Sequence, residues 1–340
     1  MKRALIMAGI TAATLSGAAL SQDEATQTDE NGFLANLLQN TLSAPGRQIS
    51  LSGVEGLLSS EASIAQITVS DDTGPWIEID NVTLDWNRAR LLLGQVDVNL
   101  LSAETIRWPR MGEAPPSTGI TLPEAEAQQF SLPELPVSIE VDEIRVDQIS
   151  LAEAVAGQAA ELSLEGGLSL ASGALSAQVD LDRLDGAGGT IDLTTSFDNE
   201  GRRLDLDLRA EEPAGGLVAS LLDIEGQPPL SLRIAGGGPL ENLDIDATLD
   251  VDGARTVTGR VTLREDPEGL RFGADLSGEI ARLVPGAYRD FFGGETSVSA
   301  DGVSLEAGGI RLETAQITTA ELDLRGRAET GPGGFPRSLD

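Results

Sequence analysis

From about residue 49 to its end, the chain alternates apolar and polar residues in short runs separated by glycines. The apolar positions of one run are Leu204, Leu206 and Leu208, and those of another are Leu243, Ile245, Ala247, Leu249 and Val251. Successive side chains of a strand point to opposite faces, so these runs build a sheet with one apolar and one acidic face. The sequence therefore predicts a mainly β protein whose apolar face needs a cover.

Charge and composition narrow the classes of partner. Aromatic residues make up 3% of the 340 residues, so a core would consist mostly of Leu, Ile, Val and Ala. The formal net charge is −32, and Lys2 is the one lysine. Nucleic acids and anionic lipid surfaces attract clusters of Lys and Arg, so this balance argues against nucleic acid and against a polybasic membrane patch.

The chain contains neither cysteine nor histidine. Disulfides, thiolate or imidazole metal ligands and a histidine general base are therefore excluded. We expect no catalytic residue, no cofactor and no metal site, and the protein is predicted not to be an enzyme.

The N-terminus has the order of an export signal. Lys2 and Arg3 precede an apolar stretch over residues 4–20, and Asp23 and Glu24 follow it. This order places the remainder of the chain outside the cytoplasm. The small residues Ala19-Leu20-Ser21 suit a cleavage site, so residues 1–21 are either a signal peptide or an uncleaved signal anchor.

Beyond this segment, changes in pattern divide the chain. Residues 22–32 are polar and acidic, and apolar residues at helical spacing from Phe33 to Leu42 predict a short helix. Six prolines interrupt the strand pattern between residues 109 and 137. Two later interruptions, over residues 217–224 and 280–292, have the spacing of short amphipathic helices. The predicted segments are 1–21, 22–48 (acidic spacer and short helix), 49–109 (first β block), 110–137 (proline-rich linker) and 138–340 (second β block).

Three strands share an irregular spacing. Their apolar residues are two, then three, then two positions apart: Ile77, Ile79, Val82 and Leu84; Ile144, Val146, Ile149 and Leu151; Val298, Ala300, Val303 and Leu305. The same face stays apolar across a three-residue step only if a bulge or a bend accommodates one extra residue. The spacing therefore predicts one long, curved and coiled sheet.

Pairs of aspartates two residues apart are the main candidates for chemistry. Such carboxylates lie about 7 Å apart on one face of a strand, which suits glycoside hydrolysis or calcium binding. They recur too often to mark one site, so a solvated outer face is the preferred interpretation. The pairs are Asp180 and Asp182, Asp205 and Asp207, Asp244 and Asp246, and Asp250 and Asp252.

All three tryptophans, Trp76, Trp86 and Trp108, lie in the first β block. Indoles favour the membrane interface, so the three could form an aromatic belt close to the N-terminal anchor. They could equally cap an open end of a narrow apolar sheet, and this structural role is the preferred interpretation.

The same block resembles the N-terminal region of the TamB family, the inner-membrane subunits of the translocation and assembly module. The matching features are the turn from Gly53 to Gly56, the D-x-G-x-W of Asp72 to Trp76, the strand from Asn81 to Trp86, the Leu91-Leu92-Leu93-Gly94 step and the exit from Ile106 to Pro109. Later pieces agree, beginning at Leu132, Glu211 and Gly236. The resemblance covers most of residues 49 to 270.

This resemblance implies an elongated, curved, one-sided antiparallel or mixed sheet that forms an apolar groove, with an N-terminal membrane helix and a few short helices. It implies a single-pass protein of the inner membrane of a Gram-negative bacterium, with its body in the periplasm and a TamA-like outer-membrane barrel as partner. It further implies a role in outer-membrane protein assembly and secretion. TamB proteins also belong with the AsmA-like proteins, and this kinship implies that phospholipids are carried between the two membranes. TamB proteins are much longer, and their C-terminal domain has no counterpart here, which puts docking to the barrel in doubt.

The apolar face and the resemblance together predict where acyl chains bind. The predicted lipid-groove residues are Leu204, Leu206, Leu208, Leu243, Ile245, Leu249 and Val251, and the predicted membrane-proximal aromatics are Trp76, Trp86 and Trp108. The alternative is an exported β-solenoid that acts as a surface or adhesion protein, whose interior would be closed and dry. A carboxylate-based polysaccharide enzyme is a third hypothesis.

Overall fold

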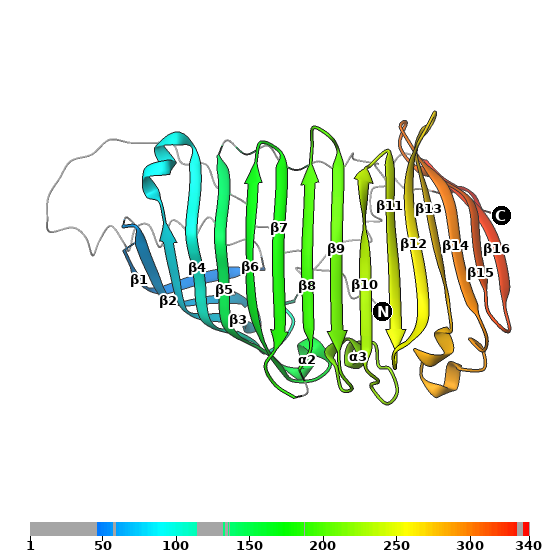
Figure 1. Cartoon of the computed structure of the whole chain (residues 1–340), viewed down its shortest axis with the longest axis horizontal. Helices are drawn as coiled ribbons and strands as arrows, with labels where there is room; N and C mark the ends of the chain where they lie inside the picture. The colour runs from blue at the N-terminus through cyan, green and yellow to red at the C-terminus, as the bar shows by residue number, and fades with distance from the viewer. Residues whose placement is uncertain are drawn as a thin grey trace, which may run out of the picture.

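The computed structural model describes residues 46–56, 59–113, 132, 135, 137–186, 188–331 and 336–339. These residues form one mixed sheet of 17 strands with a few short helical segments at its rims, which confirms the mainly β class (Figure 1). The predicted N-terminal membrane segment, the acidic spacer and the helix at Phe33–Leu42 lie outside the described residues. Within the described ranges, no helix is both long and apolar enough to cross a membrane.

The strands follow one another along the chain with few helical interruptions. The strands are β1 (Gln48–Glu55), β2 (Glu61–Asp71), β3 (Gly74–Trp86), β4 (Gln95–Trp108), β5 (Ser138–Leu151), β6 (Ala160–Ala171), β7 (Ala174–Arg183), β8 (Thr190–Asp198), β9 (Arg203–Glu212), β10 (Leu230–Pro239), β11 (Asn242–Val251), β12 (Ala254–Asp266), β13 (Gly269–Gly278), β14 (Thr296–Leu305), β15 (Ile310–Thr318), β16 (Asp323–Thr330) and β17 (Pro336–Leu339). The helical segments are η1 (Arg88–Leu93), α2 (Glu153–Ala156), α3 (Leu217–Leu221), η2 (Ile280–Arg282) and η3 (Gly286–Tyr288).

Each strand pairs with the next one along the chain, so the sheet is a long meander. Two-residue turns close several hairpins, as at Asp252-Gly253, where φ is 53° and 73°. Positive φ at both positions is the type I′ geometry that matches the twist of paired strands. β4 and β5 pair in parallel, so the end of β4 and the start of β5 lie at opposite rims of the sheet.

The predicted three-residue steps are accommodated in β5. The ladder to β6 shifts between Val141 and Ile144 and again between Val146 and Ile149, whereas β4 keeps the same spacing and stays in register with β5. β2, β3 and β4 also stay in register across the step, where Asn81 adopts a φ of 51°. The extra residues therefore bend β2–β5 together, and β5 absorbs the mismatch against the regular β6.

The third spacing behaves differently from the prediction. β14 pairs with β13 without a shift, so Val303 lies opposite Arg271 and points away from the face that Val298 and Ala300 occupy. The shift lies on the other side of β14, between Asp301 and Gly302 in the ladder to β15. The prediction that all four apolar residues share one face was wrong for Val303 and for Leu305, which lies on the same face as Val303.

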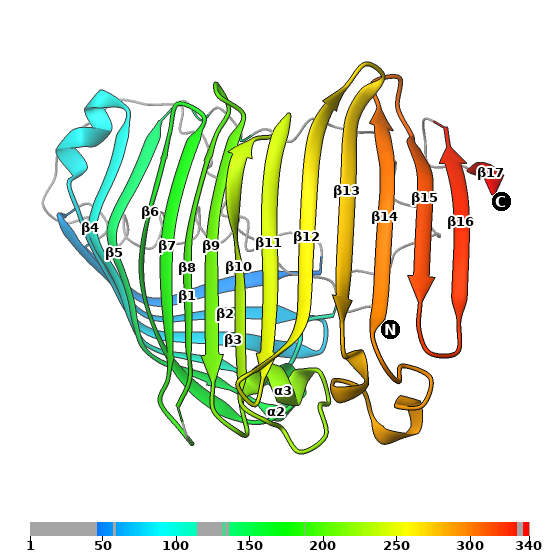
Figure 2. The same cartoon turned by 45° about the vertical axis from the view of Figure 1, so that its right-hand side comes forward.

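The bend and the twist give the sheet an open, curved shape. β1, β2 and β3 run across the direction of β7–β12 in both views, and β17 lies at the other end of the sheet (Figures 1 and 2). α2 and α3 lie at one rim, and the turn between β3 and β4 lies at the opposite rim (Figure 1). The predicted helix at 280–292 is replaced by the two short turns η2 and η3, whereas the one at 217–224 is present as α3.

Candidate functional site: an apolar face along the sheet

One row of paired residues crosses the sheet from β2 to β16 without a polar side chain. Directly paired residues on neighbouring strands point to the same face, so the row forms a continuous apolar track. This apolar row consists of Ala62, Leu84, Leu101, Ile144, Gly166, Val179, Leu193, Leu208, Ile234, Ala247, Gly259, Leu276, Val298, Ile317 and Leu324.

All seven predicted groove residues lie on the face of the apolar row. Leu208 belongs to the row itself, while Leu206 and Ile245 lie in the neighbouring row on either side of Gly236. Leu204 lies further along the same face of β9, and Leu243, Leu249 and Val251 lie along the same face of β11. The structure thus brings these residues together, and their contact with lipid stays a prediction.

The neighbouring row contains one polar residue on β8. The Thr195 hydroxyl donates a hydrogen bond to the carbonyl oxygen of Asp205 at 3.1 Å. Because the Thr195 hydroxyl is hydrogen-bonded to the backbone, it leaves no unpaired donor on the apolar face, and Thr195 contributes its methyl group there.

The apolar face is open toward the C-terminal strands. The exposed fraction is 45% for Val261 on β12, 41% for Leu276 on β13 and 54% for Leu324 on β16. Side chains of a packed core are nearly inaccessible to water, so this part of the face is a surface. The β-solenoid hypothesis requires a closed, dry interior, and the described residues do not form one.

At the α3 rim, short segments fold over the edge of the apolar face. Ala219 and Ile224 are 0% and 2% exposed and pack against Leu230 and Val251, the rim residues of β10 and β11. The buried Glu212 carboxylate holds α3 in place, because its two oxygens accept hydrogen bonds from the backbone N–H groups of Leu217 and Val218 at 2.9 and 2.8 Å. α3 therefore narrows the open face from this side.

At the opposite rim, one residue of the proline-rich segment is pinned to the β8–β9 turn. The Asn199 side chain accepts a hydrogen bond from the Leu132 N–H and donates one to the Leu132 carbonyl, both at 2.8 Å. Leu132 then packs against the cluster of Phe197, Leu240 and Leu243. Both rims of the central strands are thus bordered by apolar clusters, with the open apolar face between them.

The outer face carries the charges. Arginines hold members of three of the four predicted aspartate pairs: Asp207 accepts from both Arg209 and Arg233 at 2.9 Å, and Asp246 accepts from Arg260 at 2.6 Å. Arg203 pairs with Asp205, Arg264 with Asp244 and Arg255 with Asp250. Among the described residues, no group of three or more acidic side chains is placed to hold a metal ion. The aspartates therefore act as the polar surface of the sheet, as their recurrence indicated.

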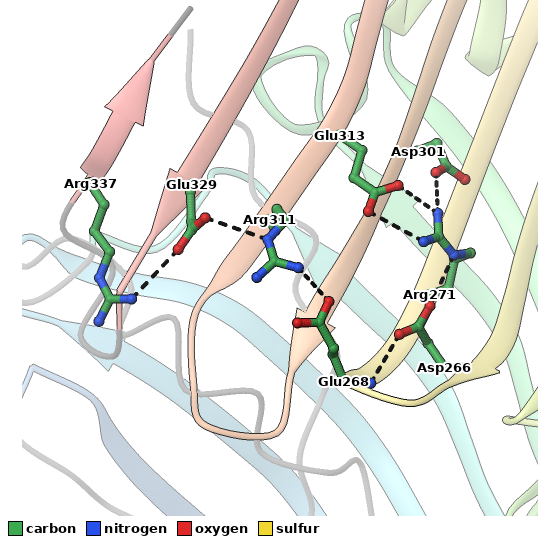
Figure 3. Close-up of polar contacts among 8 residues, drawn as sticks. All are labelled: Asp266, Glu268, Arg271, Asp301, Arg311, Glu313, Glu329 and Arg337. Atoms are coloured by element: carbon green, nitrogen blue, oxygen red, sulfur yellow. Dashed lines mark hydrogen bonds and ion pairs between the residues drawn. The ribbon is translucent and has the colours of Figure 1, made fainter.

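An ionic network covers the outer face near the C-terminal strands (Figure 3). The Arg271 guanidinium reaches Asp301 at 2.5 Å, Glu313 at 2.9 Å and Asp266 at 3.2 Å, while Arg311 pairs with Glu268 and Glu329. The hydrogen bonds to Glu313 raise the pKa of Arg271, and in return Arg271 lowers the pKa of Glu313. Val303 is paired between Arg271 and Arg311 and is 0% exposed, so the arginine stems shield an apolar residue on the polar face.

The three tryptophans do not form one group. Trp76 and Trp108 are neighbours, with ring centroids 6.2 Å apart and planes tilted by 54°. Trp86 ends the same strand as Trp76 ten residues later, roughly 33 Å away, and its indole N–H donates to the carbonyl oxygen of Ser59 at 3.0 Å. The tryptophans therefore lie at two separate places along β3, and their contact with a membrane stays a prediction.

Beside the paired tryptophans, the start of the proline-rich segment is clamped to the β2–β3 turn. Arg110 donates to both carboxylate oxygens of Asp71 at 2.8 and 2.7 Å, and the Glu113 N–H donates to the same carboxylate at 2.8 Å. These hydrogen bonds, those from Arg110 foremost, hold the pKa of Asp71 well below its usual range. The clamp directs the chain away from β4 at the rim where the crossover begins.

Sequence reasoning missed the side chains that hold the two rim closures. In the sequence, Glu212 is one of many acidic residues at strand ends, and Asn199 is a residue type common in turns. The signal for the first was the break Pro213-Ala214-Gly215-Gly216 before an apolar segment, which places a helix start near a carboxylate. The pairing of Asn199 with Leu132 joins positions 67 residues apart, and no local pattern reports it.

Comparison with curated proteins and with solved structures gives no match. A protein-family model does match residues 31–332, and its description is YdbH-like: Intermembrane phospholipid transport protein YdbH. This family is an AsmA-like relative, so the predicted kinship is confirmed at that level, while a TamB identity stays a prediction. Membership implies intermembrane phospholipid transport in the cell envelope. The match covers most of the sequence, and the chain belongs to the YdbH-like family.

Proposed function

We propose that this chain carries phospholipids along the apolar face of its sheet, with the acyl chains on the apolar row and the headgroups toward the open side. The observation that carries the proposal is the row itself, which runs across fifteen consecutive strands from β2 to β16 without a polar side chain. A soluble sheet has no structural need for such a track unless an apolar ligand covers it.

The length of the row favours a conduit over a single binding site. At about 4.8 Å per strand, the row is roughly 65–70 Å long. The acyl region of one bilayer leaflet is only about 15 Å thick. Several lipids fit along the row, and a lipid that moves by one strand meets another apolar residue at each step.

The cellular setting is part of the same proposal. The chain is exported, is held at the inner membrane by its N-terminal segment and places the sheet in the periplasm. It transfers lipid without catalysing a reaction. A TamB-like role in outer-membrane protein assembly and secretion, with a TamA-like barrel as partner, rests on the sequence resemblance alone.

Native mass spectrometry of the full chain, purified from a host with membranes, tests the proposal. We expect several phospholipids to accompany the wild-type protein and most of them to be lost in Leu206→Arg. The matched control is Gln178→Arg, which adds the same charge on the outer face of β7, where Gln178 is exposed and bonds to Asp180. Equal lipid content in both variants, or none in the wild type, would contradict the proposal.

A further inference from the structure

The turn between β3 and β4 presents three consecutive leucines to solvent. Leu92 is 91% exposed, Leu93 is 76% exposed and Leu91 is 42% exposed. Within the described ranges, no other large apolar side chain is as exposed as Leu92. Isolated apolar side chains are common on surfaces, but three in succession at the tip of one turn indicate an interaction site.

The exposure of the leucines is built into an ordered turn. The backbone N–H of Gly94 donates to the carbonyl oxygen of Leu91 at 3.0 Å, and Gly94, with a φ of 72°, ends η1. The backbone N–H of Asn87 donates to the backbone carbonyl oxygen of Asp97 at 2.7 Å, and the Arg90 guanidinium pairs with the Asp97 carboxylate at 2.8 Å. These bonds tie both ends of the turn to β4, so the leucines are held outward.

Two arginines lie beside the leucines in a chain with a net charge of −32. They are Arg88 and Arg90, of which Arg90 is paired with the flanking Asp97. Arginines beside exposed leucines match the boundary of a bilayer, where phosphates lie next to acyl chains. Trp86, two residues before Arg88, is a residue type enriched at the same boundary.

We propose that η1 is a bilayer-docking turn, in which Leu91, Leu92 and Leu93 insert into the acyl boundary of a phospholipid membrane. Arg88 and Arg90, the latter paired with Asp97, lie there at the level of the lipid phosphates. A protein partner typically covers about 800 Å² of one surface, whereas a convex tip of three leucines suits shallow insertion into lipid. Leu84 and Leu101, on the two strands that flank η1, belong to the apolar row, so docking here places the row next to the bilayer.

A fluorescent probe at the turn reports this contact in the full chain. The sequence has no cysteine, so Ala89→Cys labelled with an environment-sensitive fluorophore gives a single probe, and Ala307→Cys in the β14–β15 turn gives a matched exposed control. With vesicles of phosphatidylethanolamine and phosphatidylglycerol, we expect a blue shift and a rise in intensity at position 89 and none at position 307. The probe separates this turn from any other membrane contact of the chain.

Leucine variants complete the test. In Leu92→Ser/Leu93→Ser, the lipid concentration that gives half of the change should rise at least about tenfold, because two inserted side chains are lost. Leu222→Ser, at a leucine that is 55% exposed and lies outside the apolar row, should leave this lipid concentration unchanged. No change at position 89 with vesicle-bound protein, or an unchanged response of the double variant, would overturn the proposal.

Two other outcomes assign the leucines to a different occupant and also overturn the proposal. A shifted signal without vesicles that depends on protein concentration would show that a second copy covers the turn. A shifted signal that is independent of concentration would show that another segment of the same chain covers it. Neither outcome affects the lipid content of the apolar face, so the docking proposal can fail while the proposed transport stands.

Discussion

Leu206 of β9 and Ile245 of β11 are both paired with Gly236 of β10, so they flank a position that has no side chain on the apolar face. A Cβ atom at residue 236 would lie 2.0 Å from the backbone oxygen of Asp244. The glycine therefore allows β10 and β11 to approach closely, and it adds no side chain between two apolar residues. This relationship links the local sequence to the shape of the proposed lipid track.

Gly236→Ala should destabilise the sheet at β10 and β11. The new methyl group would have to displace backbone atoms, and overpacking of this kind costs about 1–3 kcal/mol. The free energy of unfolding from urea titration measures the loss. Gly286→Ala is the control, because its Cβ would meet only the end of the Glu225 side chain at 3.5 Å. Equal stability of the two variants would contradict the close approach of β10 and β11 at Gly236.

Charges at distant strands of the apolar row should each block phospholipid transfer. Leu193→Asp on β8 and Val298→Asp on β14 place a carboxylate on the path, and each should slow transfer between donor and acceptor vesicles by about tenfold or more. A fluorescent-lipid transfer assay measures the rate. Transfer that only one of the two positions affects would indicate a single binding site in place of a track.

The control for these variants is Thr258→Asp on the outer face of β12. Thr258 is exposed and its hydroxyl bonds to that of Ser277 on the same outer face, so the added carboxylate is solvated there. We expect a transfer rate close to that of the wild type. A loss as large as that of the row variants would show that added negative charge, and not its place on the row, slows transfer.

Much of the fold was predictable from the spacing of residues. The strict alternation around Leu206 and Ile245 fixed which face each strand presents, because a slip of one residue would turn every apolar side chain to water. The step in β5 was also readable as a bulge. The prediction placed Val303 on the wrong face, because spacing alone does not show which of the two neighbouring strands a register shift involves. Val303 tolerates the polar face because the stems of Arg271 and Arg311 cover it.

The sequence predicted the apolar character of the site, but only part of its extent. The seven residues predicted for the groove lie on two strands, whereas the apolar row reaches from Ala62 to Leu324. Positions such as Gly166 and Gly259 belong to the row although they have no side chain, so a search for large apolar residues passes over them. The rim closures by α3 and Leu132 depend on contacts between distant segments, which only the folded chain reveals.

The α3 closure should depend on Ile224. Ile224→Ala removes a side chain that is 2% exposed and should lower the free energy of unfolding by about 2–4 kcal/mol, or lower hydrogen-exchange protection of α3 if this rim opens locally. Leu222 is two residues away and 55% exposed, so Leu222→Ala should change the free energy of unfolding by less than about 0.5 kcal/mol. Similar effects of the two substitutions would mean that α3 does not pack on the sheet.

The clamp between Asp71 and Arg110 should make stability depend on acid pH. The pKa of Asp71 is lowered in the folded state, so its contribution is present above the unfolded pKa of about 3.9 and is lost as the pH falls toward the folded value. The difference in unfolding free energy between the wild type and Asp71→Asn should therefore shrink from pH 7 to pH 3. Urea titrations at the two pH values measure it, with exposed Asp252→Asn as control. A difference that stays constant would contradict the clamp.

Photo-cross-linking at adjacent residues tests the central claim most directly. A benzophenone amino acid is placed either at Leu206, on the apolar face of β9, or at Asp207, on its outer face, and the full chain is irradiated in membrane-containing cells. We predict adducts with the mass of phospholipids at position 206 and none at position 207. Lipid adducts at both positions, or at neither, would contradict the account of the apolar face as the path of the lipid.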